Sequence, residues 1–365
     1  MDYHAGGELM CIYVCKALQE LEYEVLLASQ TFQPSEFERL YGMGDIMENC
    51  TQLQIPKFKA VLPRLQSSQR LLYSLRVWPI LAGTSVDVAF STQSSPFFVR
   101  SKSTFHFIYD ISNLFAYPPD ASPLISSNNR LKKPYDAFQQ KTREVLWRKR
   151  FSPPSWFFAT GSKVLGDLRG KGYGNSSLLY PPARTMYGPI LPKKRRVIQV
   201  ARIIPDKRLE MFFDIAKRLP EYEFLLLGRN SLLTQEEFPG YSKSLLETVP
   251  DNVVYIESPL RQRPEVLQES KVYLYTGNEP GIVLSIIEAI AAGCVPLSPP
   301  RVGAADIIDA SKAGYIYENI EAACRIIRTI MKTDYSDETV NEISKKADLF
   351  SPEVFERNIQ GLVRQ

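Results

Sequence analysis

The sequence predicts an α/β protein with parallel sheets, and three observations lead to this fold class. Short apolar runs typical of buried strands alternate along the chain with segments whose apolar residues recur at helical spacing. This alternation of strand and helix indicates parallel sheets. The chain has 365 residues, which is more than a single hydrophobic core usually supports, so we expect two domains.

Composition narrows the class of protein. Hydrophobic residues make up 44% and charged residues 23% of the chain, as in an ordinary globular protein. The net charge of +4 is too small to indicate a nucleic-acid partner. No uninterrupted run of about 18 apolar residues indicates a membrane span, and residues 1–7 do not resemble a signal peptide. The five cysteines, an odd number without a Cys-x-x-Cys pair, indicate neither a disulfide framework nor zinc, so we expect a reducing, cytoplasmic compartment.

The first half of the chain begins with a glycine loop, Gly6-Gly7, and a helix over residues 9–21. An α/β domain normally has a strand before such a loop, and here only a few residues precede it. Either this first strand is missing, for example through a misassigned start, or the chain is reorganised there. A long polar segment, residues 113–133, is typical of an active-site loop. We expect strands at residues 23–28, 86–91, 105–108 and 156–160.

Two stretches of the first half, residues 53–80 and 134–151, combine basic with aromatic side chains. Such a pattern is compatible with peripheral binding to an anionic membrane surface. It is more often found in an ordinary helix whose basic face is solvated. Both interpretations stay open at this point.

The second half alternates regularly between strand and helix. Residues 188–196, rich in Pro and in charge, are typical of an interdomain linker. Ser351 is a favourable N-cap and Pro352 a favourable first helical residue, so we expect a final helix to begin there. Strands are expected at residues 197–200, 224–227, 253–256, 272–275 and 294–297, and helices at residues 209–218, 263–270 and 320–332.

Residues 276–299 form the most informative segment. A glycine-containing loop, residues 277–281, follows a predicted strand and leads into a segment with apolar residues at helical spacing. Unpaired backbone N–H groups and the positive end of the helix dipole make such a helix start a ready phosphate site. Glu288 is a carboxylate in this otherwise apolar and Ala-rich helix. Alone, it would be interpreted as a residue of a solvated face.

This segment resembles the donor-site signature of family 4 glycosyltransferases, which have the GT-B fold. The family has Glu, seven residues, Glu, and then Ala-Met-Ala-Ala-Gly, and residues 288–293 (EAIAAG) match its second half. The first half departs, because Pro280 stands where the first Glu is expected and Glu279 lies one residue earlier. Either the loop bulges to present Glu279, or the usual contact to the sugar hydroxyls is altered.

The resemblance implies a donor site. Arg202 and Lys207 fit the family's Arg-x4-Lys pair, which contacts the diphosphate with a bidentate fork and a point charge. Glu288 is implied to bind the ribose hydroxyls, since a carboxylate accepts two hydroxyl hydrogen bonds. The donor-binding residues implied by the resemblance are Gly6, Gly7, Arg202, Lys207, Glu279, Gly281, Ile282, Val283 and Glu288.

The catalytic position of the first domain departs from the family pattern. Many members have His, followed by Asp or an aromatic residue, at the end of a strand that ends here in Tyr109-Asp110. His106 stands among Phe residues and is expected to lie in the core. The resemblance then implies Asp110, Arg202 and Lys207 as catalytic residues. The family's mechanism retains configuration, with the leaving phosphate taking the acceptor proton, and it implies neither metal nor cofactor.

The resemblance also implies the domain organisation. We expect two Rossmann-like domains facing a cleft: an acceptor-side domain over residues 1–187 and a nucleotide-sugar-binding domain over residues 188–348. A last helix within residues 349–365 is expected to cross back onto the first domain.

The function implied is retaining transfer of a hexose from a UDP- or GDP-sugar to a glycan or lipid-linked acceptor. Residues 288–297, together with Tyr180-Pro181-Pro182, most resemble archaeal and eukaryotic mannosyltransferases of lipid-linked oligosaccharide assembly. One alternative is a non-catalytic protein that binds nucleotide sugar or a partner glycosyltransferase. A sugar-nucleotide epimerase is a further alternative, disfavoured because it relies on several acidic and His side chains and the chain has 2 His.

Overall fold

The computed structural model describes residues 6–29, 34–56, 76–77, 79–81, 83–92, 99–109, 155–185, 191–228, 235, 238–257 and 264–364. These residues divide into two compact units. The C-terminal unit contains the described residues of 161–163 and 180–355, and the N-terminal unit those of 5–160, 164–179 and 356–365. The domain boundaries expected from the sequence stay a prediction.

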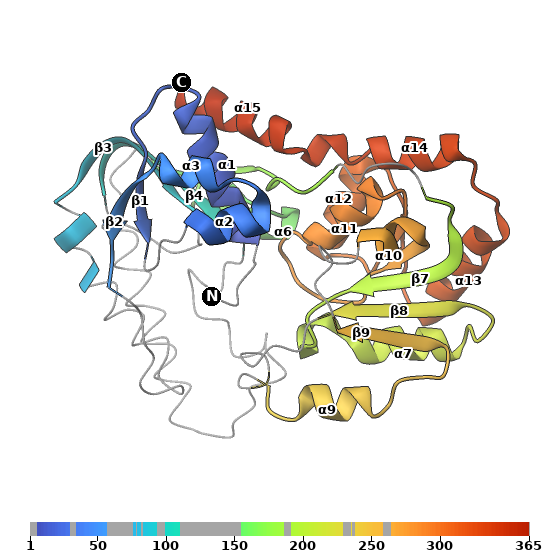
Figure 1. The fold of residues 1–365 in the computed structure, drawn as a ribbon. Coiled ribbons are helices and arrows are strands. Elements are labelled where there is room, and N and C mark those ends of the chain that lie inside the picture. Colours follow the sequence, from blue (N-terminus) through green and yellow to red (C-terminus); the bar gives the residue numbers. More distant parts are fainter. Residues whose placement is uncertain are drawn as a thin grey trace. The chain divides into compact units, whose positions relative to one another are not determined.

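The C-terminal unit is built on a six-stranded sheet in the order β12-β11-β10-β7-β8-β9, in which every neighbouring pair is parallel. Figure 1 shows its strands β7, β8 and β9 side by side. Strand β10, at an inner position, is buried along its whole length, as expected for a parallel sheet covered on both faces. The strands are β7 (Lys194–Val200), β8 (Glu223–Gly228), β9 (Val253–Glu257), β10 (Ser270–Leu274), β11 (Val295–Ser298) and β12 (Tyr315–Ile316).

Alternate residues of these strands belong to two separate buried clusters. Ile198 and Tyr273 pack in one cluster, while their neighbours Val197 and Val272 pack in the other, because successive side chains of a strand point to opposite faces. The first cluster takes in α10 (Pro264–Glu269), α11 (Leu284–Ala291) and α12 (Gly303–Ser311). The second takes in α7 (Leu209–Lys217), α9 (Tyr241–Leu246) and α13 (Ile320–Lys332). The sheet therefore lies between two helical layers.

The N-terminal unit has a four-stranded parallel sheet, β3-β4-β5-β6, and a two-stranded parallel sheet, β1-β2. Its strands are β1 (Leu26–Ser29), β2 (Thr51–Gln54), β3 (Ser85–Ser91), β4 (Arg100–Ile108), β5 (Ser155–Ala159) and β6 (Ser176–Leu178). Its helices include α1 (Gly6–Gln19), α2 (Pro34–Tyr41) and α3 (Gly44–Glu48), and α6 (Ser162–Gly170) begins among residues of the other unit. Within the described ranges, no helix is both long enough and apolar enough to cross a membrane.

The last helix, α15 (Pro352–Val363), starts in the C-terminal unit and continues in the N-terminal unit from Glu356. There Lys16 Nζ donates to both oxygens of Glu356 at 2.7 and 2.9 Å, and Gln360 Nε2 donates to Glu20 at 2.8 Å. These bonds fix α15 against α1 within one unit. In the chain, α15 follows α14 (Asp337–Lys345).

The structure confirms the α/β class with parallel sheets and corrects several details. Residues 194–196, expected in a linker, belong to β7, and β4 begins at Arg100 rather than at residue 105. Strand β2 was not predicted, and its last two residues are the first two residues of the basic stretch 53–80. The Ser351 hydroxyl accepts from Val354 N at 3.3 Å, which confirms the N-cap. Most of residues 53–80, and all of residues 113–133 and 134–151, lie outside the described residues.

Candidate functional site

The candidate site lies where two neighbouring strands of the C-terminal unit end. β7 and β10 pair in parallel, with Val272 opposite Val197 and Tyr273 opposite Ile198. The segment with Arg202 and Lys207 follows β7, and the loop 275–283 follows β10. The carboxyl ends of parallel strands meet at one edge of the sheet, which is where α/β proteins bind ligands.

Two hydrogen bonds tie these two segments together, and a third joins the loop to Gln199 in β7. Thr276 Oγ1 donates to the carbonyl of Lys207 at 2.8 Å and lies 3.0 Å from Gln199 Oε1. Asn278 N donates to the carbonyl of Asp206 at 3.1 Å. Thr276 and Gln199 are fully buried, so the short helical turn at Pro205–Lys207 is held in a fixed place beside the loop.

Lys207 and Glu279 are brought into direct contact. Their side chains form an ion pair in which the ammonium of Lys207 meets Oε1 of Glu279, and the two side chains are 13% and 26% exposed. The other carboxylate oxygen of Glu279 accepts a hydrogen bond from the hydroxyl of Tyr275. Lys207 Nζ also lies 5.6 Å from the centre of the Tyr275 ring. Burial, together with the nearby Glu279 charge, raises the pKa of Tyr275 well above its usual value, so Tyr275 is a neutral donor.

Arg202 and Glu288, the other two charged residues expected in the donor site, differ in burial. The side chain of Arg202 is exposed, and none of its contacts within the described residues joins it to Lys207. Glu288 is half-buried on α11. The Tyr273 hydroxyl lies 2.6 Å from Ser285 Oγ and donates to the carbonyl of Val200 at 3.2 Å. Burial raises the pKa of Tyr273, and the charges of Glu288 and Glu279 add to this shift, so both carboxylates act on the same buried phenol.

The first turn of α11 offers backbone donors. Its N-cap is Val283, whose side chain has no oxygen to accept from the first N–H groups, and no described side chain caps it. The side chains of Ile282 and Val283 pack in the first buried cluster. At these two positions a ligand can therefore be bound only by backbone groups.

Two glycines allow close packing around the loop. Gly303 N donates to the carbonyl of Glu279 at 3.0 Å, and a Cβ at Gly303 would collide with the carbonyl of Gly281. A Cβ at Gly161 would lie 2.7 Å from the carbonyl of Pro280. Asp306 then accepts from the backbone N–H of Ser162 at 2.6 Å. The loop is thus enclosed by backbone of two other segments of the same unit.

From the sequence, Asp110, Gly6 and Gly7 of the first domain are expected in the site and His106 in the core. Asp110 lies outside the described residues. Gly6 and Gly7 form the first turn of α1. His106 is 1% exposed and stacks on Phe157 with ring centres 5.2 Å apart, and burial lowers its pKa to about 4. It is therefore a neutral core residue, as expected.

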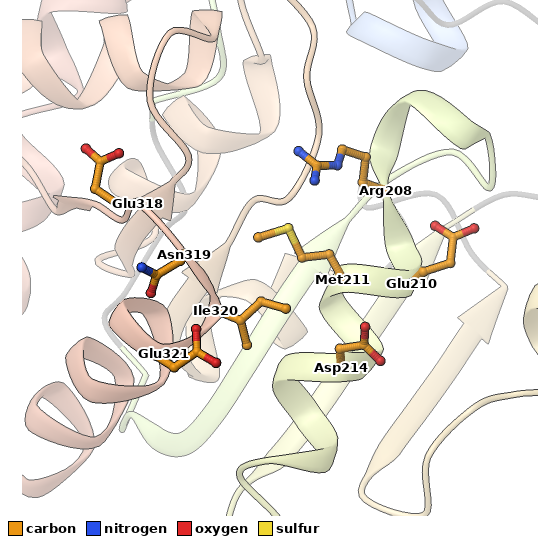
Figure 2. A pocket seen from close by; sticks show the side chains of 8 residues that line it. All are labelled: Arg208, Glu210, Met211, Asp214, Glu318, Asn319, Ile320 and Glu321. Atoms are coloured by element: carbon orange, nitrogen blue, oxygen red, sulfur yellow. The ribbon is translucent and has the colours of Figure 1, made fainter. Parts of the chain in front are cut away.

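Next to Lys207, the C-terminal unit has a hollow of about 520 Å³. Figure 2 shows that its walls come from Arg208 with the start of α7 and from the start of α13. The lining residues are Arg208, Glu210, Met211, Asp214, Glu318, Asn319, Ile320 and Glu321. Four carboxylates against one guanidinium disfavour a diphosphate there, and Arg202, Lys207, Glu279 and Glu288 are not among the lining residues.

The sequence pattern did not point to Tyr275 and Thr276 as site residues. Both were assigned to a strand or its end, and their roles depend on the hydroxyl groups that they direct at Glu279 and at Lys207. A tyrosine next to a threonine at the end of a buried strand is the one local signal. Among the described residues, no group of three or more His, Cys, Asp or Glu could hold a metal ion.

Comparison with known proteins gives a family match over the C-terminal part of the chain. Residues 188–349 match the profile of the family Glycosyl transferases group 1. No curated protein matches the chain.

Three solved structures are similar over nearly the whole chain. WaaG, a glycosyltransferase involved in lipopolysaccharide biosynthesis, is 16% identical, with 98% of this chain and 96% of that chain covered and a TM-score of 0.65. Alr3699/HepE from Anabaena, in complex with UDP and glucose, is 13% identical, with 100% and 97% covered and a TM-score of 0.66. Sucrose-phosphate synthase from Thermosynechococcus elongatus is 14% identical, with 96% and 91% covered and a TM-score of 0.68.

At these identities the solved structures establish the fold alone, and the family profile covers residues 188–349 of the 365 residues. The fold is the α/β GT-B fold with parallel sheets. The C-terminal part of the chain, residues 188–349, is similar to the group 1 glycosyltransferases. The finer resemblance to archaeal and eukaryotic mannosyltransferases of lipid-linked oligosaccharide assembly stays a prediction.

Proposed function

We propose that the protein is a retaining glycosyltransferase that moves a hexose from a UDP- or GDP-sugar to a glycan or lipid-linked acceptor, without a metal. One observation carries the proposal. Lys207 and the loop 275–283 meet at the carboxyl edge of the sheet, beside the first turn of α11, which no described side chain caps. A cation and free backbone donors at one place suit a diphosphate.

The chemistry of the transfer explains why positive charge is needed there. The bond between the anomeric carbon and the diphosphate breaks, and the leaving diphosphate gains negative charge. Lys207, Arg202 and the backbone N–H groups of residues 281–283 stabilise that charge. The acceptor oxygen bonds to the anomeric carbon on the face that the leaving group departs from, and its proton passes to the leaving phosphate. Configuration is then retained, and no protein base is required.

The remaining donor contacts come from carboxylates. Glu288, half-buried on α11, accepts hydrogen bonds from the two ribose hydroxyls. Glu279 belongs to the same site through its pairing with Lys207. The similar Anabaena protein HepE has been solved with UDP and glucose, which supports a nucleotide-sugar donor. We place the reaction in the cytoplasm, with peripheral contact to the membrane where the acceptor is lipid-linked.

The proposal is tested by nucleotide release and by two variants. The protein is incubated with UDP- and GDP-sugars and candidate acceptors, and release of the nucleoside diphosphate is measured. Arg202→Ala and Glu288→Ala are each expected to weaken donor binding roughly tenfold or more, since each loses a hydrogen-bonding charged group. Arg195→Ala, an exposed arginine near the start of β7, is the matched control and is expected to change nothing. Unchanged donor affinity in both site variants would show that the donor assignment is wrong.

A non-catalytic binding protein is the second candidate. The observation that favours it is the replacement of the first signature Glu by Pro280, with Glu279 turned to Lys207. Saturable binding of a nucleotide sugar without release of diphosphate, in the presence of lipid and glycan acceptors, would identify this candidate.

A further inference from the structure

The pairing of Lys207 with Glu279 places a negative group on the cation assigned to the diphosphate. Both carboxylate oxygens of Glu279 are engaged, one by Lys207 and the other by Tyr275. The main chain of Glu279 is fixed as well, because its carbonyl accepts from Gly303 N at 3.0 Å. Glu279 is therefore held in place by three groups: the Lys207 ammonium, the Tyr275 hydroxyl and the Gly303 backbone N–H.

Tyr275 is itself held rigidly. It is 1% exposed, its backbone N–H donates to the carbonyl of Leu297 at 2.8 Å, and its carbonyl accepts from the hydroxyl of Tyr317 at 2.7 Å. Its hydroxyl is a neutral donor whose described partner is Glu279. A phenol fixed in this way can keep the carboxylate in one orientation.

Gly277 leaves the room that this arrangement needs. A Cβ at Gly277 would collide with the Tyr275 hydroxyl and would lie 2.7 Å from Oε2 of Glu279. The observed placement of the Tyr275 hydroxyl and the Glu279 carboxylate therefore demands a residue without a side chain at position 277. This demand is steric and does not depend on the backbone conformation of the glycine.

We propose that Glu279 is an internal counter-ion of Lys207, which the diphosphate of the donor must displace, and that Tyr275 and Gly277 position it. The inference rests on the proposed donor site. A carboxylate and a diphosphate compete for one ammonium, because together they would place like charges around it in a partly buried site. Glu279 therefore lowers the affinity for any ligand whose hold on the protein is mainly its diphosphate.

This role has a consequence for turnover. One product of such a reaction is a nucleoside diphosphate, and product release limits the rate of many enzymes. As the diphosphate leaves, the carboxylate of Glu279 returns to Lys207 and replaces it there. The counter-ion thus speeds release of the product, while the sugar of the intact donor adds contacts that the product lacks.

The test measures binding of UDP and GDP, without sugar, by isothermal titration calorimetry. Glu279→Gln keeps the shape of the side chain and removes its charge, and we expect it to tighten diphosphate binding roughly tenfold, which is about 1.4 kcal/mol. Lys207→Met is expected to weaken binding. In the double variant the gain from Glu279→Gln is expected to vanish, since a coupling between two groups is lost when either is absent. Tyr275→Phe is expected to tighten binding roughly two- to threefold.

Glu269→Gln is the matched control. Glu269 also pairs with cations, Lys194 at 2.6 Å and Arg196 at 3.3 Å. Both lie in the first half of β7, away from the carboxyl end where the donor site is placed. The substitution changes the net charge by the same amount, and diphosphate affinity is expected to stay unchanged. A thermal melt of each variant verifies that it is folded.

Two results would overturn the inference in distinguishable ways. If Lys207→Met weakens binding while Glu279→Gln leaves it unchanged or weaker, the counter-ion role is wrong and the donor site stands. If neither diphosphate binds the parent protein or any variant, the donor site and the counter-ion role both fall.

Discussion

The two units of the chain differ in how completely their strands are covered. β10, an inner strand of the C-terminal unit, is buried at every residue, whereas β1 of the N-terminal unit alternates between exposed and half-buried residues. The C-terminal sheet joins six strands between two large buried clusters. The described strands of the N-terminal unit form sheets of four and two strands, with smaller clusters beside them.

This difference matches the demands of the site. The candidate donor residues follow β7 and β10, both anchored in the two large clusters. A site that must place charges around a diphosphate needs rigid supports. The N-terminal unit contains the pair between Lys16 and Glu356 and the buried, neutral His106. Its stability should therefore respond to single charge changes and to pH.

The largest expected effect compares matched core deletions in the two units. Ile286, 0% exposed, packs in the first C-terminal cluster, and Ile46, 8% exposed, packs in the small cluster beside α1. We expect Ile286→Ala to lower the free energy of unfolding by about 4 kcal/mol and Ile46→Ala by about 2 kcal/mol, because the dense cluster collapses less around the cavity.

The measurement is urea denaturation, with hydrogen exchange by mass spectrometry to assign each transition to a unit. Val254→Ala, at a residue 47% exposed, is the control and is expected to have almost no effect. Equal losses for the two isoleucines would refute the proposed difference in packing.

The next effect is a pH dependence of the N-terminal unit. Burial lowers the pKa of His106 from 6.5 to about 4. The unfolded chain therefore takes up a proton below pH 6.5 that the folded unit does not accept until about pH 4. The stabilisation is present above pH 6.5 and is lost as the pH falls to 4, by about 3 kcal/mol.

Thermal melts of the parent protein and of His106→Phe between pH 4 and 7 would check this. Phe is chosen because the imidazole stacks on Phe157, so an aromatic ring preserves the contact. The variant should lose the part of the pH dependence that falls between the two pKa values. An unchanged pH profile would mean that His106 is not the group responsible.

The same difference in burial explains which elements could be predicted from the sequence. The bounds of α13 agree with the prediction, and the strands β7 to β11 all lie within a few residues of the predicted ones. Strands buried on both faces produce continuous apolar runs, which are easily detected. β2 has the sequence TQLQ and only half-buried or exposed residues. No hydrophobic pattern in the sequence therefore predicts this strand or its pairing with β1.

The candidate site could be predicted only in part. The positions of Arg202 and Lys207 after a strand follow from local sequence, and the structure places them there. The contact between Lys207 and Glu279 requires β7 and β10 to be neighbours. The order of strands in the sheet depends on how the helices pack over the whole sheet. A local sequence pattern does not predict this order. The roles of Arg202, Lys207 and Glu288 in donor binding stay predictions.

A smaller effect is expected from the pair that ties α15 to α1. The Glu356 side chain is 8% exposed and that of Lys16 is 35% exposed. Lys16→Met removes the cation from a mostly buried carboxylate, and we expect a loss of about 1–2 kcal/mol, below the range of fully buried pairs because Lys16 reaches solvent. Urea denaturation of Lys16→Met beside Lys346→Met, an exposed lysine, would check it. No loss relative to that control would show that the Lys16–Glu356 pair does not hold α15 in place.

The smallest effect uses a backbone feature that the two units share. Glu22 follows α1 with a φ of 62°, and Lys312 follows α12 with a φ of 55°. Both values lie in the left-handed region, which glycine adopts more readily after a helix. Glu22→Gly and Lys312→Gly are each expected to raise the free energy of unfolding by about 0.5 kcal/mol, because relief of strain slightly exceeds the entropy that glycine adds to the unfolded chain. Hydrogen exchange of α1 and α12 can resolve each change in its own unit. Since the gain is local, each variant should slow exchange in one helix only; slower exchange in both would mean that the two units unfold together.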